Sequence, residues 1–352
     1  MRILIDAMGG DNAPEAVVEG CIAALARTPG FDVLMIGDAK TVSRLVSSKG
    51  YSGGRINIKH SSQVIGGSDV PTKAIKEKRD SSIVIGLNMV KATEGDCFIS
   101  FGNTGALLTG AMLLTGRLEG VDRPALAPIL PTAMGGAMLI DAGLNTSCKP
   151  INYMQFAEIG SIYMREMFNI ANPRVGLINV GTEENKGTAV VKEAYQCLSG
   201  LSDINFVGNV EGRDLVDGAC DVAVCDGFIG NVVLKCYEGI GSFIKVGIRD
   251  AFKKNSISKV AAALVKKDIS AFFKKLDYEC YGGTPILGIK RSVFKGHGSS
   301  NAKAVMYAVE SAVEFCKSTI MQQLEKKYAD KSMITHLLSN GNGNENCNEN
   351  EN

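Results

Sequence analysis

The sequence predicts an α/β fold, a three-layer α/β/α sandwich with a mixed, mostly parallel sheet. Short apolar runs of strand length alternate along the chain with segments of helical periodicity, as in parallel strands joined by crossover helices. Several of these runs end in glycine and small polar residues where the next helix should begin. A basic amphipathic segment over residues 250–278 predicts a helical element that protrudes from the sandwich.

The composition is that of a large globular protein. The 352 residues are 45% hydrophobic and 21% charged and include 40 glycines, which favours an α/β enzyme over a disordered or fibrous chain. The net charge of +1 argues against nucleic acid as a partner, because phosphate backbones bind strongly basic surfaces. Ten scattered cysteines without a CxxC pair are typical of reduced, cytoplasmic proteins. We expect no signal peptide and no membrane span.

Apolar periodicity places the individual elements. Strands are predicted over residues 2–6, 31–36, 56–59, 97–101, 125–130, 137–142, 175–180, 204–207, 222–225 and 289–294. Helices are predicted within residues 71–94, 152–168, 257–276 and 301–328. The short link between strands 125–130 and 137–142 permits an antiparallel pair, which would make the sheet mixed. Residues 281–288, YGGTPILG, are too glycine-rich for a helix and are predicted to form a loop.

The most informative stretch is GLINVGTEENKG, residues 176–187, where a buried strand ends at Gly181 and a helix is expected to begin. A glycine turn into a helix N-terminus leaves backbone N–H groups that can bind an anion. Thr182, Asn185 and Lys186 add hydrogen-bonding groups and a positive charge to this turn. Taken alone, the stretch is explained equally well as a capped helix start with a surface lysine.

Three further strand ends have the same character. Their residues are Asn103, Thr104 and Gly105 after strand 97–101, Asp226, Gly227 and Asn231 after strand 222–225, and His297, Ser299 and Ser300 after strand 289–294. Because open α/β sheets bind ligands at the carboxyl ends of their strands, we expect all four ends to share one cleft. Asp141, near the end of strand 137–142, is a further candidate for this cleft. The simpler alternatives are a structural loop histidine for His297 and a turn-capping aspartate for Asp141.

Residues 245–275 contain nine Lys or Arg and two Asp, so this segment is strongly basic within a nearly neutral chain. Apolar residues recur at helical spacing from Ile257, and lysines fall mostly between them. Such a helix can lie on an anionic membrane, bind an acidic protein or pack against a second subunit. The polar, low-complexity end of the chain predicts a disordered tail over residues 331–352.

Common catalytic motifs are missing from the sequence. The GxSxG nucleophile elbow and the GxGxxG dinucleotide fingerprint are absent, and GTEENKGT breaks the GK[ST] order of a P-loop. The histidines His60, His297 and His336 are far apart in sequence, and we expect neither a metal site nor a cofactor. The remaining candidate groups are backbone amides, asparagines, a lysine and a histidine. These groups are suited to binding an oxyanion and a small anion.

Nine motifs follow one another along residues 1–328. They are DAMGGD at 6–11, DSS at 80–82, FGNTGA at 101–106, DRPALAP at 122–128, GTEENKG at 181–187, GNVEGRD at 208–214, CDGFIGN at 225–231, YGGTP at 281–285 and HGSS at 297–300. In this order they resemble the bacterial acyl-carrier-protein:phosphate acyltransferase family (PlsX). The sequence departs from the family pattern at two places. Phe101 stands where a small residue is expected, and LIDAGLN at 139–145 replaces an LDVGAN-like run.

The resemblance implies a homodimer whose fold is similar to phosphotransacetylases and isopropylmalate dehydrogenases. It implies a reaction of acyl-[acyl-carrier-protein] with inorganic phosphate that gives acyl phosphate and free carrier protein, early in phospholipid biosynthesis. The implied partners are acyl carrier protein, phosphate, a membrane surface and a downstream glycerol-3-phosphate acyltransferase. The implied location is the cytoplasm, peripherally on the inner face of the membrane. The chemistry fits, because phosphate is an anionic nucleophile and a thiol is a tolerable leaving group.

On this interpretation Lys186 and the amides of residues 181–187 hold phosphate, while Asn231 and Asn103 bind the developing oxyanion. His297 protonates the leaving thiolate or orients phosphate. The other strand-end residues named above line the substrate site. The residues expected to contact the membrane or the carrier protein are Lys259, Val260, Leu264, Lys266, Lys267 and Phe272.

Three alternative functions stay open. A decarboxylating NAD-dependent dehydrogenase on the related fold would need clustered carboxylates for a divalent metal. A phosphotransacetylase would use acyl-CoA as the donor. A non-enzymatic membrane scaffold for lipid enzymes would leave the polar strand ends unexplained. We expect residues 1–330 to form one catalytic α/β domain, as a single body or as two lobes that share a cleft.

Overall fold

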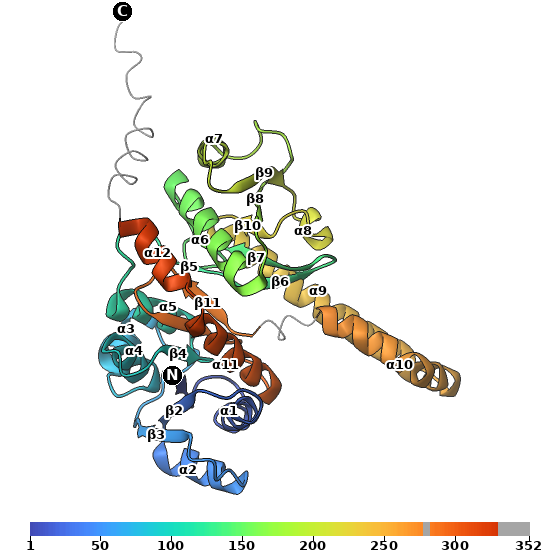
Figure 1. Cartoon of the computed structure of the whole chain (residues 1–352). Coiled ribbons are helices and arrows are strands. Elements are labelled where there is room, and N and C mark those ends of the chain that lie inside the picture. The colour runs from blue at the N-terminus through green and yellow to red at the C-terminus, as the bar shows by residue number, and fades with distance from the viewer. Residues whose placement is uncertain (277–281, 330–352) are drawn as a thin grey trace, which may run out of the picture.

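The computed structural model describes residues 1–276 and 282–329, with side chains up to residue 269 in the first range. The Phe272 side chain, Tyr281 and the predicted tail 331–352 lie outside the described residues. The described strands form a seven-stranded and a five-stranded sheet with helices on their faces (Figure 1). The mixed, mostly parallel α/β fold is thus confirmed, although its strands divide between two sheets where one was predicted.

The seven-stranded sheet contains the N-terminal strands. Its order is β3 (Ile56–His60), β2 (Asp32–Gly37), β1 (Arg2–Asp6), β4 (Cys97–Ser100), β12 (Ser292–Lys295), β11 (Thr284–Leu287) and β5 (Ala125–Leu126). Neighbouring strands are parallel except at β11, which is antiparallel to both β12 and β5. The loop predicted over residues 281–288 is wrong for residues 284–287, which form strand β11. Burial of the apolar residues of β11 outweighs the unfavourable effect of the glycines on either side.

The five-stranded sheet has the order β6 (Ile129–Thr132), β7 (Gly135–Ile140), β10 (Val222–Val224), β8 (Arg174–Ile178) and β9 (Asn205–Val210). Strands β6 and β7 form the predicted antiparallel pair, in which Thr132 lies opposite Gly135. The other pairs are parallel. The predicted strand 125–130 is divided, since β5 belongs to the first sheet and β6 to the second. The chain therefore crosses between the sheets at residues 127–128.

Helices cover both faces of the first sheet. Ile3 and Ile5 of β1 pack toward α1 (Glu15–Arg27) and α11 (Ala302–Lys317), and Leu4 packs toward the opposite layer, as strand alternation requires. That layer is formed by α3 (Pro71–Glu77), α4 (Ser82–Lys91), α5 (Thr104–Gly110) and the π-helical turn η1 (Ala111–Thr115). Helix α2 (Ala39–Ser48) connects β2 and β3. The predicted helix 71–94 is two helices, because the Ser81 hydroxyl caps α4 by accepting from Val84 N.

On the second sheet, α6 (Pro150–Phe168) packs with α7 (Ala189–Ser199) and α12 (Ile320–Ala329). The other face meets α8 (Asp214–Asp217) and the first turns of α9 (Gly227–Lys253). One apolar cluster contains residues of both sheets, including Ile5 and Val175, and α6 contributes many of its members. The two sheets are therefore joined through a shared core.

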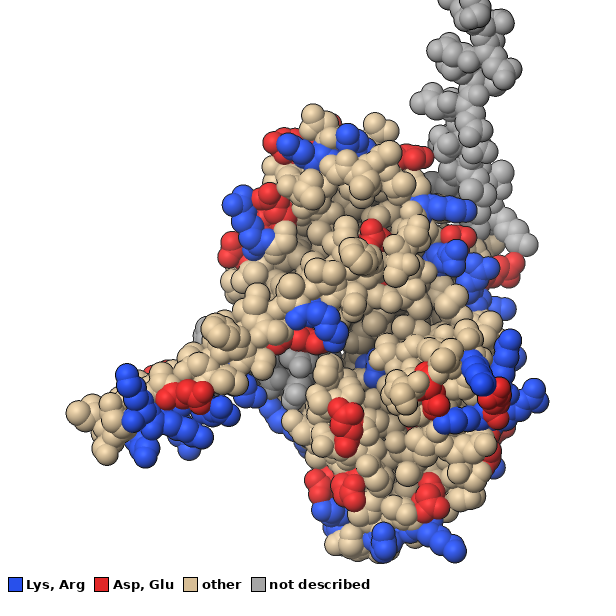
Figure 2. All heavy atoms as spheres, turned by 180° about the vertical axis from the view of Figure 1, so that it is seen from behind, with Lys and Arg blue, Asp and Glu red and all other residues tan. Residues whose placement is uncertain are grey.

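Helices α9 and α10 (Ser256–Leu276) pack against each other and project from the body (Figure 1). The predicted helical segment over 250–278 is thus confirmed for α10, and α9 lengthens the projection. Lys and Arg side chains gather on this arm (Figure 2). No helix in the part of the chain that the structure describes has both the length and the apolar character needed to cross a membrane.

Candidate active site

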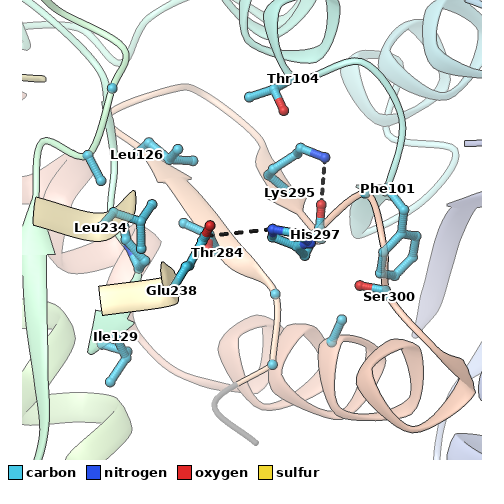
Figure 3. A pocket seen from close by; sticks show the side chains of 18 of the residues that line it. Phe101, Thr104, Leu126, Ile129, Leu234, Glu238, Thr284, Lys295, His297 and Ser300 are labelled. Atoms are coloured by element: carbon cyan, nitrogen blue, oxygen red, sulfur yellow. Dashed lines mark hydrogen bonds and ion pairs between the residues drawn. The ribbon is translucent and has the colours of Figure 1, made fainter. Parts of the chain in front are cut away.

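A cavity of about 360 Å³ lies where the two sheets meet (Figure 3). The first sheet contributes Phe101 and Thr104 after β4, Thr284 of β11 and the turn after β12. The second sheet contributes residues of β6, the turn after β7 and one face of α9. Polar side chains and the apolar residues Leu126, Ile129, Leu130 and Leu234 line the same space. The cavity can therefore hold a ligand with a polar and an apolar part.

His297 connects the two walls of the cavity. Its Nδ1 lies 2.8 Å from Ser299 Oγ in the turn after β12, and its Nε2 lies 3.7 Å from Glu238 Oε1 on α9. Lys235 Nζ donates to the other oxygen of Glu238 at 2.7 Å. Burial raises the pKa of Glu238, but hydrogen bonds from His297 and Lys235 outweigh burial and hold this pKa below its usual value. The carboxylate thus keeps the His297 ring facing the cavity.

Asn231 reaches the cavity because the start of α9 is fixed against the end of β7. The Asp226 carboxylate caps the helix by accepting from Ile229 N at 2.9 Å. Gly230 packs so closely that a Cβ there would lie 1.8 Å from the Asp141 carbonyl oxygen. Asn231, Lys235 and Glu238 then follow on one helical face and all line the cavity.

Asp141 has the turn-capping role that was the simpler alternative. Its buried carboxylate accepts from the backbone N–H groups of Leu126, Leu144 and Asn145 and from the Asn145 side chain. Gly227 is also structural, because its N–H donates to Asn145 O and a Cβ there would meet the Asn145 backbone at 2.8 Å. Asp226 and Gly227 support the cavity from behind and do not line it.

The turn after β4 divides its predicted residues between the cavity and the scaffold. Thr104 lines the cavity, whereas Gly105 and Asn103 do not. The Asn103 Oδ1 accepts from Ala106 N at 2.9 Å and caps α5, and its Nδ2 donates to Gly66 O at 2.9 Å. Because both ends of this amide are used, its position gives no support to the predicted oxyanion role.

The stretch at residues 181–187 lies outside the cavity. Lys186, Thr182 and Asn185 are exposed, and Gly181 is buried beneath the turn. Helix α7 begins only at Ala189, so the predicted helix start directly after Gly181 is wrong. Strand β8 is separated from the β6 and β7 edge by β10, and its end is therefore one strand farther from the first sheet. Three of the four predicted strand ends meet in the cavity, and this one does not.

Ser299 and Ser300 lie at the start of α11. Ser300 lines the cavity, while Ser299 contacts the His297 ring without lining it. The Asn12 side chain donates to the carbonyl oxygens of Ser299 and Ser300 at 3.1 and 3.2 Å, which ties the DAMGGD segment to this turn. Asn301 caps α11 by accepting from Ala304 N at 3.0 Å.

Lys235, Glu238 and Lys295 are cavity residues that the sequence analysis missed. Asn231, Lys235 and Glu238 are spaced i, i+4 and i+7, so the helical face of Asn231 could have identified the first two. Lys295 ends the buried strand β12 directly before the predicted turn, and a lysine after an apolar run was an available signal. Its side chain is buried, and burial lowers the pKa of Lys295 to about 8.

Asp6 lies behind this turn at the end of β1. The buried carboxylate accepts from Ser100 Oγ at 2.6 Å and from Met8 N at 3.1 Å. Burial raises the pKa of Asp6, and hydrogen bonds from Ser100 and Ser82 offset this only in part. Among the described residues, no group of three His, Cys, Asp or Glu side chains is placed to hold a metal ion.

Comparisons with known proteins agree with this architecture. Among solved structures, a phosphotransacetylase from Streptococcus pyogenes superposes with a TM-score of 0.60 at 14% identity, covering 90% of this chain and 94% of that one. A branched-chain phosphotransacylase from Enterococcus faecalis V583 gives a TM-score of 0.56 at 12% identity, covering 90% of this chain and all of that one. The chain is thus an α/β protein with the phosphotransacetylase fold.

Sequence comparison identifies the family. A family model described as "Fatty acid synthesis protein" matches residues 1–323. A phosphate acyltransferase from Acetivibrio thermocellus is 50% identical over 330 residues, which cover 94% of this chain and 97% of that protein. A phosphate acyltransferase from Thermoanaerobacter pseudethanolicus is 44% identical over 327 residues, covering 93% and 97%. The chain belongs to the phosphate acyltransferase family that its motifs resemble.

Proposed function

We propose that the protein transfers the acyl group of acyl-[acyl-carrier-protein] to inorganic phosphate, which gives acyl phosphate and free carrier protein, in the phospholipid pathway. The observation that carries this proposal is the composition of the cavity. Asn231, His297 and two lysines line the same space as an apolar wall, so an anion and an acyl chain can be bound together. Membership of the phosphate acyltransferase family supports phosphate and an acyl donor as the substrates.

The reaction requires little acid–base catalysis from the protein. A phosphate oxygen attacks the thioester carbonyl carbon, the carbonyl oxygen becomes an oxyanion, and the C–S bond then breaks as the thiolate leaves. Positioning the two reactants can contribute roughly 7–11 kcal/mol, and one good oxyanion donor about 3–4 kcal/mol. We assign the oxyanion contact to the Asn231 amide and protonation of the thiolate to His297, which Glu238 orients.

The predicted phosphate role of Lys186 has no support from its exposed position outside the cavity. The Lys186→Ala variant decides the question in assays at subsaturating phosphate. The predicted role requires a clearly lower rate than that of the parent. A near-normal rate would remove Lys186 from the site.

We assign the contacts with the carrier protein and with the membrane to the arm formed by α9 and α10. Lys259, Lys266 and Lys267 are exposed on α10, and an acidic carrier protein or an anionic lipid surface is attracted to such a cluster. Val260 and Leu264 are exposed on the same helix, which favours an apolar contact as well. We propose that the protein is a cytoplasmic homodimer held peripherally at the inner face of the membrane. At this location a downstream glycerol-3-phosphate acyltransferase could receive the product.

The deciding experiment measures release of carrier-protein thiol from a long-chain acyl donor by purified protein. We expect release that depends on inorganic phosphate, together with acyl phosphate that hydroxylamine traps. Acyl-CoA in place of the acyl carrier protein separates the proposal from the phosphotransacetylase alternative. Absence of phosphate-dependent release with either donor would reject the acyltransferase function and favour the scaffold alternative.

A further inference from the structure

The lysine at the end of β12 is held in the cavity by backbone carbonyl groups. Lys295 is only 8% exposed, and its Nζ donates to Gly102 O at 2.9 Å and to Gly296 O at 2.5 Å. These carbonyls belong to the turns after β4 and β12, two neighbouring parallel strands in which Lys295 pairs with Ser100. The ammonium group therefore joins the two turns that form one wall of the cavity (Figure 3).

Two carbonyl oxygens use two of the three N–H donors of a lysine. Within the described residues, the hydrogen bonds of Lys295 Nζ go to these two carbonyl oxygens, and carboxylates act on it only through longer-range attraction by Asp6 and Asp11. Lys235, the other lysine of the cavity, differs because Glu238 accepts from it at 2.7 Å and its side chain is 57% exposed. Lys295 is thus the cavity lysine whose charge a bound ligand would neutralise.

The surroundings of Lys295 provide charge at longer range. Burial lowers its pKa most, Asp6 and Asp11 raise it, and Lys235 lowers it further. Asp6 ends β1, which is separated from β12 by β4, and it is itself buried, with hydrogen bonds from Ser100 and Ser82. A multiply charged anion in the cavity would add the negative charge that these groups do not fully supply.

We propose that Lys295 binds the inorganic phosphate of the reaction. The Gly102 and Gly296 carbonyls hold its ammonium group in position, and the negative charge of Asp6 favours its charged form. This inference rests on the proposed function of the cavity. This assignment leaves Asn231, on the facing wall, to bind the thioester carbonyl. His297, in the turn after β12, is left to protonate the leaving thiolate. Phosphate then approaches from the side of the first sheet, and the acyl donor from the side of α9.

The primary test compares Lys295→Met with Lys290→Met. Lys290 is an exposed lysine five residues earlier, outside the cavity, so its replacement is a matched loss of charge. We expect the KM for phosphate to rise about ten-fold or more in Lys295→Met, as for loss of a charged hydrogen bond, and to change less than about two-fold in Lys290→Met. The KM for the acyl donor should change little in both. A folded Lys295→Met protein with the parental phosphate KM would overturn the proposal.

A conservative variant separates a phosphate contact from a purely structural support. Arginine keeps its charge at every accessible pH, whereas Lys295 loses its proton near pH 8. The kcat/KM for phosphate reports groups of the free enzyme, so it should fall above about pH 8 in the parent and keep its value there in Lys295→Arg. The same alkaline fall in Lys295→Arg would overturn the proposal, even if Lys295→Met does not fold.

Equilibrium dialysis with radiolabelled inorganic phosphate tests the contact without the reaction. We expect the parent to bind phosphate in the absence of an acyl donor and Lys295→Met to bind at least about ten times more weakly. If the parent binds phosphate in this way but releases no carrier thiol, the proposed function fails and the site assignment stands. Equal binding by the parent and Lys295→Met would overturn the assignment whatever the catalytic result.

Discussion

At the scale of single residues, Asn231 is the predicted site residue whose role can be tested most cleanly. It is exposed near the start of α9 and lines the cavity, so its side chain is not needed for packing. Removal of one oxyanion donor typically lowers turnover about 100-fold to 1,000-fold. We therefore expect Asn231→Ala to lower kcat by this amount at saturating phosphate and acyl donor, with the unfolding free energy unchanged.

The neighbouring Val232 offers the matched control for Asn231. It is also exposed on α9 but lies outside the cavity, and Val232→Ala should keep the parental kcat. A kcat of Asn231→Ala within about three-fold of the parent would show that the amide contributes little to the oxyanion, since a lost donor should cost more.

Some site residues could be predicted from sequence and others could not, for identifiable reasons. Local pattern was sufficient for the residues that lie within seven positions of a strand end, which are Asn231, Thr104, His297 and Ser300. Lys235 and Glu238 reach the cavity only through the helical face that Asn231 begins. The outward position of Lys186 depends on the order of strands in the second sheet, which no local pattern contains.

At the scale of elements, the placement of α9 depends on Gly230. Its Cα faces the Asp141 carbonyl so closely that a methyl group would overlap it. Because the obstacle is backbone, it cannot move as a side chain would, and Gly230→Ala should lower the unfolding free energy by about 3 kcal/mol, measured by urea denaturation. Activity should fall as well, because Asn231 follows directly.

Gly241 provides the opposite case on the same helix. A Cβ at Gly241 would meet nothing within 4 Å, so alanine there only improves helix propensity. We expect Gly241→Ala to raise the unfolding free energy by about 0.5–1 kcal/mol. Equal effects of the two substitutions would mean that close packing at Gly230 does not hold the helix.

The attachment of α12 to α6 should depend on pH through Glu158. The buried carboxylate accepts from Tyr328 Oη at 2.7 Å and forms an ion pair with Lys327 at 3.0 Å. Burial raises the pKa of Glu158 above its usual 4.5, and Lys327 and Tyr328 offset this only in part. The folded state therefore binds more protons than the unfolded chain, and the contribution of Glu158 to the unfolding free energy decreases as pH rises from 4.5 through the raised pKa.

Urea unfolding of Glu158→Gln and Glu166→Gln at several pH values tests this sign. Glu166 lies on the same helix, but hydrogen bonds from Thr319 and Gln323 lower its pKa, so its stabilisation should be present above the usual carboxyl pKa and be lost on acidification. The difference from the parent should thus shrink with rising pH for Glu158→Gln and grow for Glu166→Gln. A pH-independent difference for Glu158→Gln would contradict the burial effect.

Most elements follow from local pattern, and the exceptions are those decided by tertiary pairing. Strand β8 and helix α10 lie where apolar periodicity places them. Strand β11 was missed because Gly282, Gly283 and Gly288 surround four residues that become a strand only between β12 and β5. The division of residues 125–130 between two sheets likewise depends on partners distant in sequence.

At the scale of the whole molecule, the arm of α9 and α10 is the feature that the proposed active-site cavity does not explain. Phe243 on α9 is 78% exposed, and Ile257 and Leu264 on α10 are 82% and 81% exposed. Apolar side chains at this density, beside lysines, are typical of surfaces that another body covers. The base of the same arm lines the cavity, since Lys235 and Glu238 belong to α9.

Sedimentation with anionic lipid vesicles tests whether that body is a membrane. We expect the parent to pellet with the vesicles, less so at high salt because the lysine contribution is screened, and Leu264→Asp to stay largely in the supernatant. Leu113→Asp is the matched control, because Leu113 is also exposed, at 60%, but lies on η1 away from the arm. If Leu264→Asp pellets as the parent does, the membrane contact is not made by this face of α10. A loss of dimers in Leu264→Asp, measured by light scattering without lipid, would instead assign the face to a second copy of the chain.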